Sequence, residues 1–136
     1  MKVFLDTNVL ASAFTTRGLC ADVLLLVIEE HELLTGDVVL GELKAVLRRK
    51  FGVPTETVSQ IEGFLRQYFV ERSPKEFPIL KLSDNNDVLV VTSALNAGAD
   101  VLVTGDGEIL GLEDKPIKIV NPREFWTLAS RRKTKR

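Results

Sequence analysis

The sequence predicts an α/β protein, built as a three-layer α/β/α sandwich with a central, mainly parallel sheet. Two observations predict this fold class. Short apolar runs that are typical of buried strands alternate along the chain with longer stretches of helical periodicity. Acidic residues follow several of these runs, as they do where parallel strands end at a ligand crevice. Because parallel strands need crossover connections, the alternation favours helices on both faces of the sheet.

The first elements have clear start and stop signals. VFL at 3–5 is the first predicted strand, and Thr7 or Asn8 caps a helix directly after it. A longer helix is predicted from about Leu19 to Glu30. ELLTG at 32–36 is the second predicted strand.

Two amphipathic helices are predicted next. Asp37 caps the first, which runs to about Lys50 before Gly and Pro residues break it. Thr55 caps the second, which we expect to continue to Phe69. The apolar stripe of this second helix consists of Val58, Ile61, Leu65, Tyr68 and Phe69.

The second half of the chain continues the alternation. SPKEFPIL at 73–80 is a Pro-rich connection into a possible third strand, and SDNND at 83–87 caps a helix from about Asn86 to Asn96. VLVT at 101–104 is a continuous apolar strand, followed by the acidic turn GDGE. PIKIV at 116–120 is the last strand, and NPREFWTLA at 121–129 is a terminal helix with a proline in its first turn.

Composition bounds the domain organisation. The 136 residues, 45% of them hydrophobic, suffice for one domain with a sizeable core, which we expect over residues 1–130. The stretch RRKTKR at 131–136 is expected to be a disordered basic tail. Without this tail the chain has 13 Lys and Arg against 19 Asp and Glu, a net charge of −6. The overall charge of −1 therefore excludes neither a nucleic-acid partner nor a small molecule.

The chain has one cysteine, Cys20, and one histidine, His31. This excludes a disulfide framework and a tetrahedral zinc site, and it fits a cytoplasmic location. No apolar run is long enough for a signal-peptide core or a membrane span. A single histidine also excludes two-histidine acid–base cleavage of RNA, so hydrolysis would have to use water activated by a metal.

Four acidic residues lie where strands are predicted to end or helices to run: Asp6, Glu42, Asp87 and Asp106. Asp6 and Asp106 each follow an apolar run, and the carboxyl ends of parallel strands face the ligand crevice. Carboxylates brought together there repel one another unless a proton or a cation intervenes. The pattern therefore predicts a divalent metal and metal-assisted chemistry.

Each acid also has a structural interpretation. Asp6 is typical of a turn after a strand, and Asp87 is typical of a helix cap. Glu42 shares a helix face with Arg49, which is typical of an exposed salt-bridged surface. Taken singly, none of these residues decides between structure and chemistry.

The order of the motifs is more specific than any single residue. DTN follows the first strand, an acid lies in GELKAVLRR, and SDNNDVLVVTSAL and TGD follow in that order. This pattern resembles the PIN-domain family over nearly the whole chain, from VFLDTNVL to KIVNPREF. It looks closest to the branch of toxin components in toxin–antitoxin pairs, similar to VapC-type ribonucleases.

The resemblance implies an endoribonuclease that depends on one or two Mg²⁺ or Mn²⁺ ions. It assigns the roles of catalytic acids and metal ligands to Asp6, Glu42, Asp87 and Asp106. Asn8 and Thr104 match polar supports of the family. Thr7 is expected to add a hydrogen bond to a ligand, and Arg49 to hold a phosphate or to pair with Glu42.

One segment departs from the family pattern. SDNND carries Asn85 and Asn86 where this branch usually has further acids, although Asp84 and Asp87 remain. A weaker or altered second metal site is the expected consequence. Glu108, two residues after Asp106, is a fifth candidate ligand, and its alternative interpretation is a solvated helix cap.

The implied partners are an RNA substrate, a cognate antitoxin protein and a second copy of the chain in a homodimer, with no membrane. Three other functions remain open: a non-catalytic PIN-fold nucleic-acid-binding or scaffold protein, a deoxyribonuclease of similar fold, and a receiver-like phosphoacceptor module. Early DTN and late TGD argue against the receiver. The RNA target is not readable, because the aromatic residues mostly fall on predicted core faces.

Overall fold

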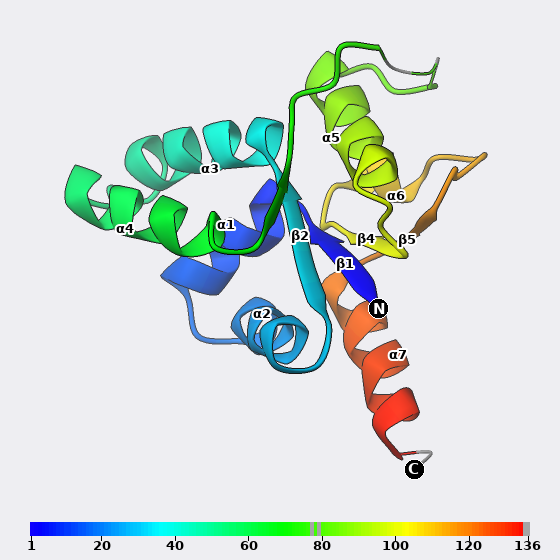
Figure 1. Ribbon diagram of the computed structural model, residues 1–136, viewed down its shortest axis with the longest axis horizontal. Helices are drawn as coiled ribbons and strands as arrows, with labels where there is room; N and C mark the ends of the chain where they lie inside the picture. Colours follow the sequence, from blue (N-terminus) through cyan, green and yellow to red (C-terminus); the bar gives the residue numbers. More distant parts are fainter. Residues whose placement is uncertain (77, 79, 135–136) are drawn as a thin grey trace.

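The computed structural model describes residues 1–76, 78 and 80–134, the last four of them as backbone only. Five parallel strands form one sheet in the order β3-β2-β1-β4-β5 (Figure 1). The strands are β1 Lys2–Leu5, β2 Glu32–Gly36, β3 Phe69–Glu71, β4 Val101–Val103 and β5 Lys118–Val120. The helices are α1 Thr7–Thr15, α2 Leu19–Glu30, α3 Asp37–Arg49, α4 Thr55–Leu65, α5 Asn85–Asn96, α6 Gly107–Leu110 and α7 Pro122–Thr134.

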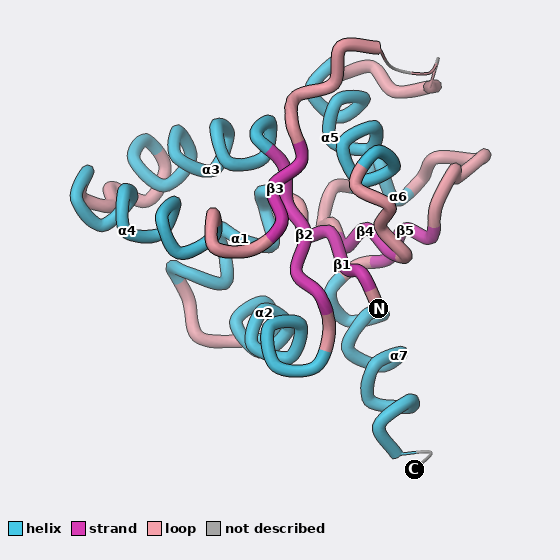
Figure 2. The backbone as a smooth tube through the Cα atoms, viewed as in Figure 1, coloured by secondary structure: helices cyan, strands magenta, loops and turns pink. Residues whose placement is uncertain are grey.

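Helices cover both faces of the sheet, which confirms the predicted three-layer fold. Helices α1 to α4 lie on one side and α5 and α6 on the other (Figure 2), while α7 packs against α2. The middle strand β1 is buried on both faces, and its residues Val3, Phe4 and Leu5 have no exposed surface. In register, Phe4 lies beside Leu34 of β2 and Leu102 of β4. The apolar runs are continuous because both sides of each strand are covered.

Two predicted elements are wrong, and one competing interaction explains both. The expected helix to Phe69 ends at Leu65, and the third strand is β3 instead of the segment at 73–80, whose described residues form no strand. Residues of β3 pair in parallel with Leu34 to Gly36 of β2. Backbone hydrogen bonds to β2 therefore override the helical apolar pattern locally.

The N-caps of α1, α3 and α4 lie one or two residues before the predicted ones. Asp6, rather than Thr7 or Asn8, is the N-cap of α1, and its carboxylate accepts a hydrogen bond from the backbone N–H of Thr7. Gly36 precedes α3 and Pro54 precedes α4, so that Asp37 and Thr55 are the first helical residues. An acid in the first turn still interacts favourably with the helix dipole.

The predicted boundary at residue 130 falls inside α7, which continues to Thr134. The backbone of the first four residues of the basic stretch is thus helical, while its side chains and residues 135–136 lie outside the described part. The division into a 1–130 domain and a tail remains a prediction. Among the described residues, no single helix is long and apolar enough to cross a membrane; α1 and α2 reach that length only as a pair bent by 104°.

Candidate active site at the carboxyl end of the sheet

The direction of the strand order changes at β1. From β1 the chain builds β2 and β3 on one side and then returns to place β4 and β5 on the other. In open parallel sheets, ligands bind at the carboxyl ends of the strands at such a point. Asp6 follows β1 immediately, and Asp106 follows β4 after two residues. The topology therefore places two of the predicted acids in the position where a ligand crevice is expected.

Asp6 is held rigidly. It is only 4% exposed, and its backbone N–H continues the β1–β4 ladder by donating to the Val103 carbonyl at 3.0 Å. One carboxylate oxygen accepts from the Thr7 backbone N–H at 2.7 Å. The other accepts from the Thr104 hydroxyl at 2.7 Å and from the Asn8 amide at 3.3 Å. Three donors on one carboxylate fix its rotamer and stabilise its charge.

Thr104 connects the two strand ends. Its fully buried hydroxyl donates to Asp6 and accepts from the Asp106 backbone N–H at 3.0 Å. The Asn8 side chain reaches the same hydroxyl at 3.4 Å, and its carbonyl oxygen accepts from the Gly105 N–H at 2.8 Å. The expected supports Asn8 and Thr104 thus lie where they can orient both acids. The hydroxyl of Thr7, also expected to help, is buried and has no hydrogen-bond partner among the described residues.

Gly105 is a further residue of the candidate site, and the sequence pattern contained it only as part of the TGD motif. A Cβ atom there would lie 3.2 Å from the Asn8 carbonyl oxygen, which already accepts the Gly105 N–H. The glycine in TGD therefore allows the backbone after β4 to approach the DTN turn closely. The TGD motif itself was the available signal.

The predicted acidic turn GDGE begins a short helix. Asp106 is the N-cap of α6, and its carboxylate accepts from the N–H groups of Glu108 at 2.8 Å and Ile109 at 3.3 Å. Glu108 is exposed, and both of its oxygens accept from the Ser83 hydroxyl, at 2.7 and 3.0 Å. Ser83 was not predicted to contribute to the site, and it links the loop before α5 to α6.

Glu42 reaches the site from α3, and its partner comes from α5. The Asn86 side-chain amide donates to Glu42. Asn86 is one of the two residues that depart from the acidic family pattern, and the amide supplies a donor where an acid would repel Glu42. Arg49 is exposed and forms no ion pair with Glu42 among the described residues. The expected contact of Arg49 to a phosphate stays a prediction.

The acids share an electrostatic field. Burial raises the pKa of Asp6 above its ordinary value; the hydrogen bonds from Thr104 and Thr7 oppose this rise, and the charges of Glu42 and Asp106 add to it. The carboxylates of Glu42 and Asp106 therefore lie close enough to Asp6 for their charges to disfavour its ionisation.

Asp87 belongs to the same field. Burial raises its pKa to about 6, and the charges of Asp106, Asp84, Asp6 and Glu108 add to the rise. Asp87 lies in the first turn of α5, where the N-cap is Asp84. The charges of Asp106, Asp6 and Glu108 thus act on Asp87, and that of Glu42 acts on Asp6, although these acids come from α3, α5, the end of β1 and the turn into α6.

The donor set fits a hard divalent cation. It consists of carboxylate, amide and hydroxyl oxygens, which Mg²⁺ and Mn²⁺ prefer. Among the described residues, no three Asp, Glu, His or Cys side chains are spaced to hold an ion between them. Mg²⁺ does not need such a cage, because it keeps several waters and binds through one or two carboxylates together with substrate phosphates. Binding of this kind would use one or two of Asp6, Asp87 and Asp106.

The raised pKa of Asp87 leads to a testable pH dependence. Since the folded pKa is about 6 and the unfolded value is about 4, folding favours the protonated carboxyl. Metal-free protein should therefore lose stability as the pH rises from about 4 to 6 and stay at the lower value above 6. We expect Asp87→Asn to raise the free energy of unfolding by about 1 kcal/mol at pH 7, the partly exposed group being screened by water.

Thermal unfolding in EDTA at pH 4 and pH 7 measures this difference. The variant should match the unchanged protein at pH 4 and unfold at a higher temperature at pH 7. Added Mg²⁺ should stabilise the unchanged protein at pH 7 more than the variant, since bound cations relieve the same repulsion. If the variant and the unchanged protein unfold at the same temperature at pH 7 as well as at pH 4, the pKa of Asp87 is not raised in the folded protein.

A family model matches most of the chain. The model of the family described as PIN domain matches residues 2–108. No curated protein sequence matches the chain.

Several solved structures are similar in fold. The VapBC2 structure of Rickettsia felis, bound to a DNA fragment from its promoter, matches with a TM-score of 0.68 and 19% identity, over 89% of this chain and 98% of the other. VapC20 of Mycobacterium tuberculosis, a sarcin-ricin loop cleaving toxin, gives 0.56 and 17%, over 84% and 99%. A protein of Pyrobaculum aerophilum gives 0.64 and 17%, over 96% and 90%. At these identities the likeness shows the fold alone.

Proposed function

The chain belongs to the PIN-domain family, and from this premise we propose that it is a divalent-cation-dependent endoribonuclease that acts as the toxin of a toxin–antitoxin pair. The observation that carries the proposal is the acidic cluster of Asp6 and Asp106 at the ends of β1 and β4, where the DTN and TGD motifs are joined through Thr104. Fold alone does not assign an activity, so the argument rests on these side chains.

The catalytic roles follow from how each acid is held. Asp6 and Asp106 are fixed by backbone and hydroxyl donors, so they offer ligand oxygens at constant positions. Asp87 and Glu42 approach from helices on the two sides of the sheet. These four acids, together with Glu108, would hold one or two Mg²⁺ or Mn²⁺ ions, directly or through water. A bound cation of this kind activates a water molecule for attack on the phosphodiester and stabilises the leaving oxygen.

The supporting residues hold the acids in position. Asn8 and Thr104 donate to the carboxylate of Asp6, and the hydroxyl of Thr104 accepts from the backbone N–H of Asp106, so the two strand ends are tied together. Arg49 is exposed near the end of α3 and is free to hold a phosphate of the RNA backbone. The apolar core packs against the strands and helices that carry the acidic cluster and holds them rigidly.

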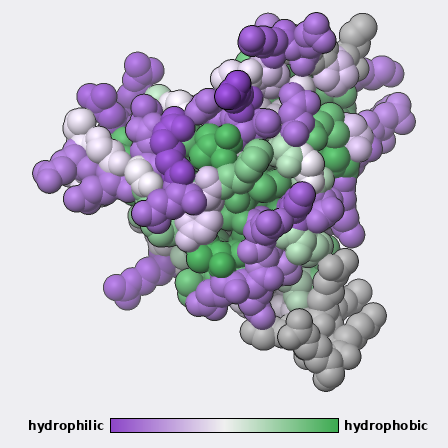
Figure 3. Space-filling view, viewed as in Figure 1, coloured by the Kyte–Doolittle hydropathy of each residue, from purple (hydrophilic) through white to green (hydrophobic). Residues whose placement is uncertain are grey.

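The proposed partners rest on the similar proteins. The similar VapC20 is described as a toxin that cleaves the sarcin-ricin loop, which supports RNA as the substrate. The similar VapBC2 structure supports a cognate antitoxin protein as a partner. We also propose a homodimer and a cytoplasmic location for this chain. Apolar side chains gather in the middle of the face shown in Figure 3, over β2 and β3, and are available for a protein contact.

The proposal is tested by cleavage of RNA. We expect the purified protein to cut at least one member of a pooled panel of single-stranded and structured RNAs when Mg²⁺ or Mn²⁺ is present. EDTA should abolish the cleavage, because the acids cannot activate water without the cation.

A matched DNA panel separates the ribonuclease from a deoxyribonuclease of the same fold. Binding of RNA without cleavage of any substrate, while Mn²⁺ binds to the acids, would instead favour a non-catalytic nucleic-acid-binding protein. Absence of both cleavage and cation binding contradicts the proposal.

A further inference from the structure

A groove lies between α1 and the C-terminal half of α3, next to the acidic cluster. It has a volume of about 350 Å³. Thr7, Asn8 and Glu42 line it together with Lys50 and Phe51, so it begins among residues of the candidate active site. From Glu42 to Lys50 the helix rises roughly 12 Å, at 1.5 Å for each residue. The groove is therefore long enough to hold a short stretch of a polymer next to a phosphate bound at the acids.

Phe51 is an exposed aromatic residue in this groove. Its side chain is 40% exposed, whereas the chain's large apolar residues are mostly buried. The Nζ atom of Lys50 lies 5.7 Å from the centre of the ring. Exposed aromatic faces beside cations are the platforms on which single-stranded nucleic acids stack their bases. Phe51 is thus an exception to the expectation that the aromatic residues mostly fall on core faces.

The charge around Phe51 favours a polyanion. Arg48, Arg49 and Lys50 are consecutive, exposed, and in no salt bridge among the described residues. They lie at the end of α3, while the body of the chain carries excess negative charge. These three cations therefore attract a phosphate backbone that approaches the acidic cluster.

We propose that this groove binds an unpaired RNA nucleotide next to the cleaved phosphate, with its base stacked on Phe51 and its phosphate held by Lys50. The inference rests on the proposed ribonuclease function and deepens it, because it names single-stranded RNA as the substrate at this position. A paired base is stacked between its neighbours and cannot offer its face to Phe51.

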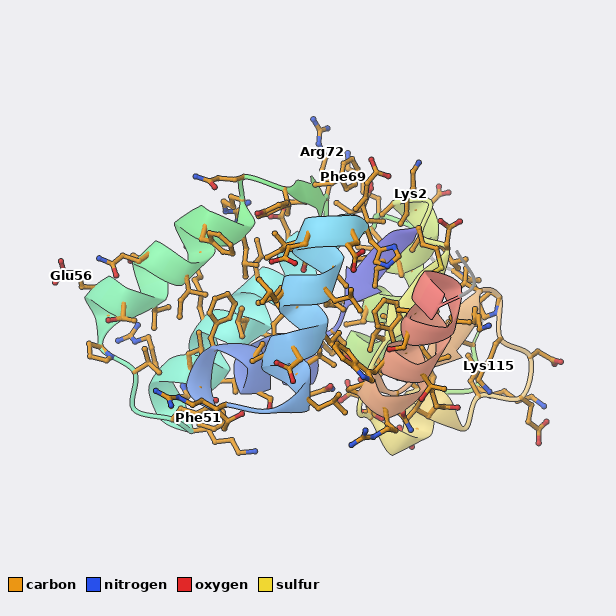
Figure 4. The ribbon with its side chains drawn as sticks, turned by 90° about the horizontal axis from the view of Figure 1, so that it is seen from below. Lys2, Phe51, Glu56, Phe69, Arg72 and Lys115 are labelled. Atoms are coloured by element: carbon orange, nitrogen blue, oxygen red, sulfur yellow. The ribbon has the colours of Figure 1, made fainter. Side chains whose placement is uncertain are left out.

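Phe69 provides a matched control. It is an exposed phenylalanine, 51% exposed, and it lines a different cavity with Lys2 and Tyr68. Phe51 and Phe69 lie at opposite edges of the molecule in the view of Figure 4. A general effect of removing an exposed aromatic residue should appear at both positions, and stacking of a base in the groove at Phe51 alone.

The test measures binding without cleavage. Phe51→Trp, in a Trp126→Phe and Asp6→Asn background with Mg²⁺, is titrated with a mixed-sequence single-stranded oligoribonucleotide and with its duplex. We expect the single strand to quench the indole fluorescence and the duplex to leave it unchanged. The same titration of Phe69→Trp should show no quenching.

Affinity gives a second measurement. Phe51→Ala should weaken binding of the single strand roughly five- to hundredfold, and Phe51→Tyr should restore it. Lys50→Ala should lower the slope of binding against salt by about one. Phe69→Ala should do neither. If neither tryptophan is quenched, or if Phe51→Ala and Phe69→Ala lose equal affinity for the single strand, the groove does not bind a base as proposed. Failure of the unchanged protein to cleave any RNA contradicts the ribonuclease proposal separately.

Discussion

Asp6→Asn is expected to lower the rate of RNA cleavage by about 10³-fold or more. Asp6 is the most rigidly held of the acids, because Thr7, Asn8 and Thr104 all donate to its two oxygens. An asparagine removes the negative charge and turns an NH₂ group toward these donors. Loss of a group that holds the reacting centre costs on the order of 4 kcal/mol in transition-state stabilisation. Cleavage of a labelled RNA substrate at saturating Mg²⁺ measures it.

A control must separate chemistry from folding. Asp22 is an exposed acid in the first turn of α2, and Asp22→Asn should leave the cleavage rate unchanged. Thermal unfolding of Asp6→Asn should stay close to that of the unchanged protein, since relief of the burial cost of the charge offsets the poorer hydrogen bonds. A folded Asp6→Asn protein with undiminished activity would remove Asp6 from the catalytic site.

Thr104→Val is expected to lower activity by roughly 10- to 100-fold and the free energy of unfolding by about 1–3 kcal/mol. The substitution keeps the shape of the side chain but removes the hydroxyl that donates to Asp6 and accepts from the Asp106 N–H. Two buried polar groups then lose a partner. Cleavage rates as a function of Mg²⁺ concentration, together with chemical denaturation, measure both effects.

Thr104→Ser is the matched variant for this position. It keeps the hydroxyl and loses only a methyl group, so it should retain activity within a few-fold of the unchanged protein. A purely structural role of Thr104 would lower stability without changing the Mg²⁺ concentration needed for half-maximal rate. A shift in that concentration in Thr104→Val alone would show that the hydroxyl positions the acids.

Local signals predicted the bounds of two elements to the residue. The predicted bounds of α2 and β2 agree with the structure, because the periodicity of the first and the flanking residues of the second are local. The helix α4 was predicted four residues too long. Tyr68 and Phe69 continue its apolar stripe, but the backbone at 69–71 pairs with β2, a partner more than thirty residues away. The helical pattern in the sequence gives no sign of this pairing with β2.

The candidate site shows the same division. Asp6, Asp87 and Asp106 could be chosen from the sequence because strand ends and helix starts are local features. Two features around them could not be chosen in this way. The donor to Glu42 comes from Asn86 on another helix, and the exposure of Phe51 depends on how the chain turns between α3 and α4.

The sequence by itself determined the fold class, the order of the motifs and the acids that follow the strands, because each of these depends on residues close together in the chain. Only the tertiary structure decided the strand order, the joining of DTN and TGD through Thr104, and the raised pKa of Asp87. The physical reason is range. Thr104 and Asp6 are 98 residues apart, and hydrogen bonds, burial and charge repulsion over such separations exist only after β1 and β4 have paired.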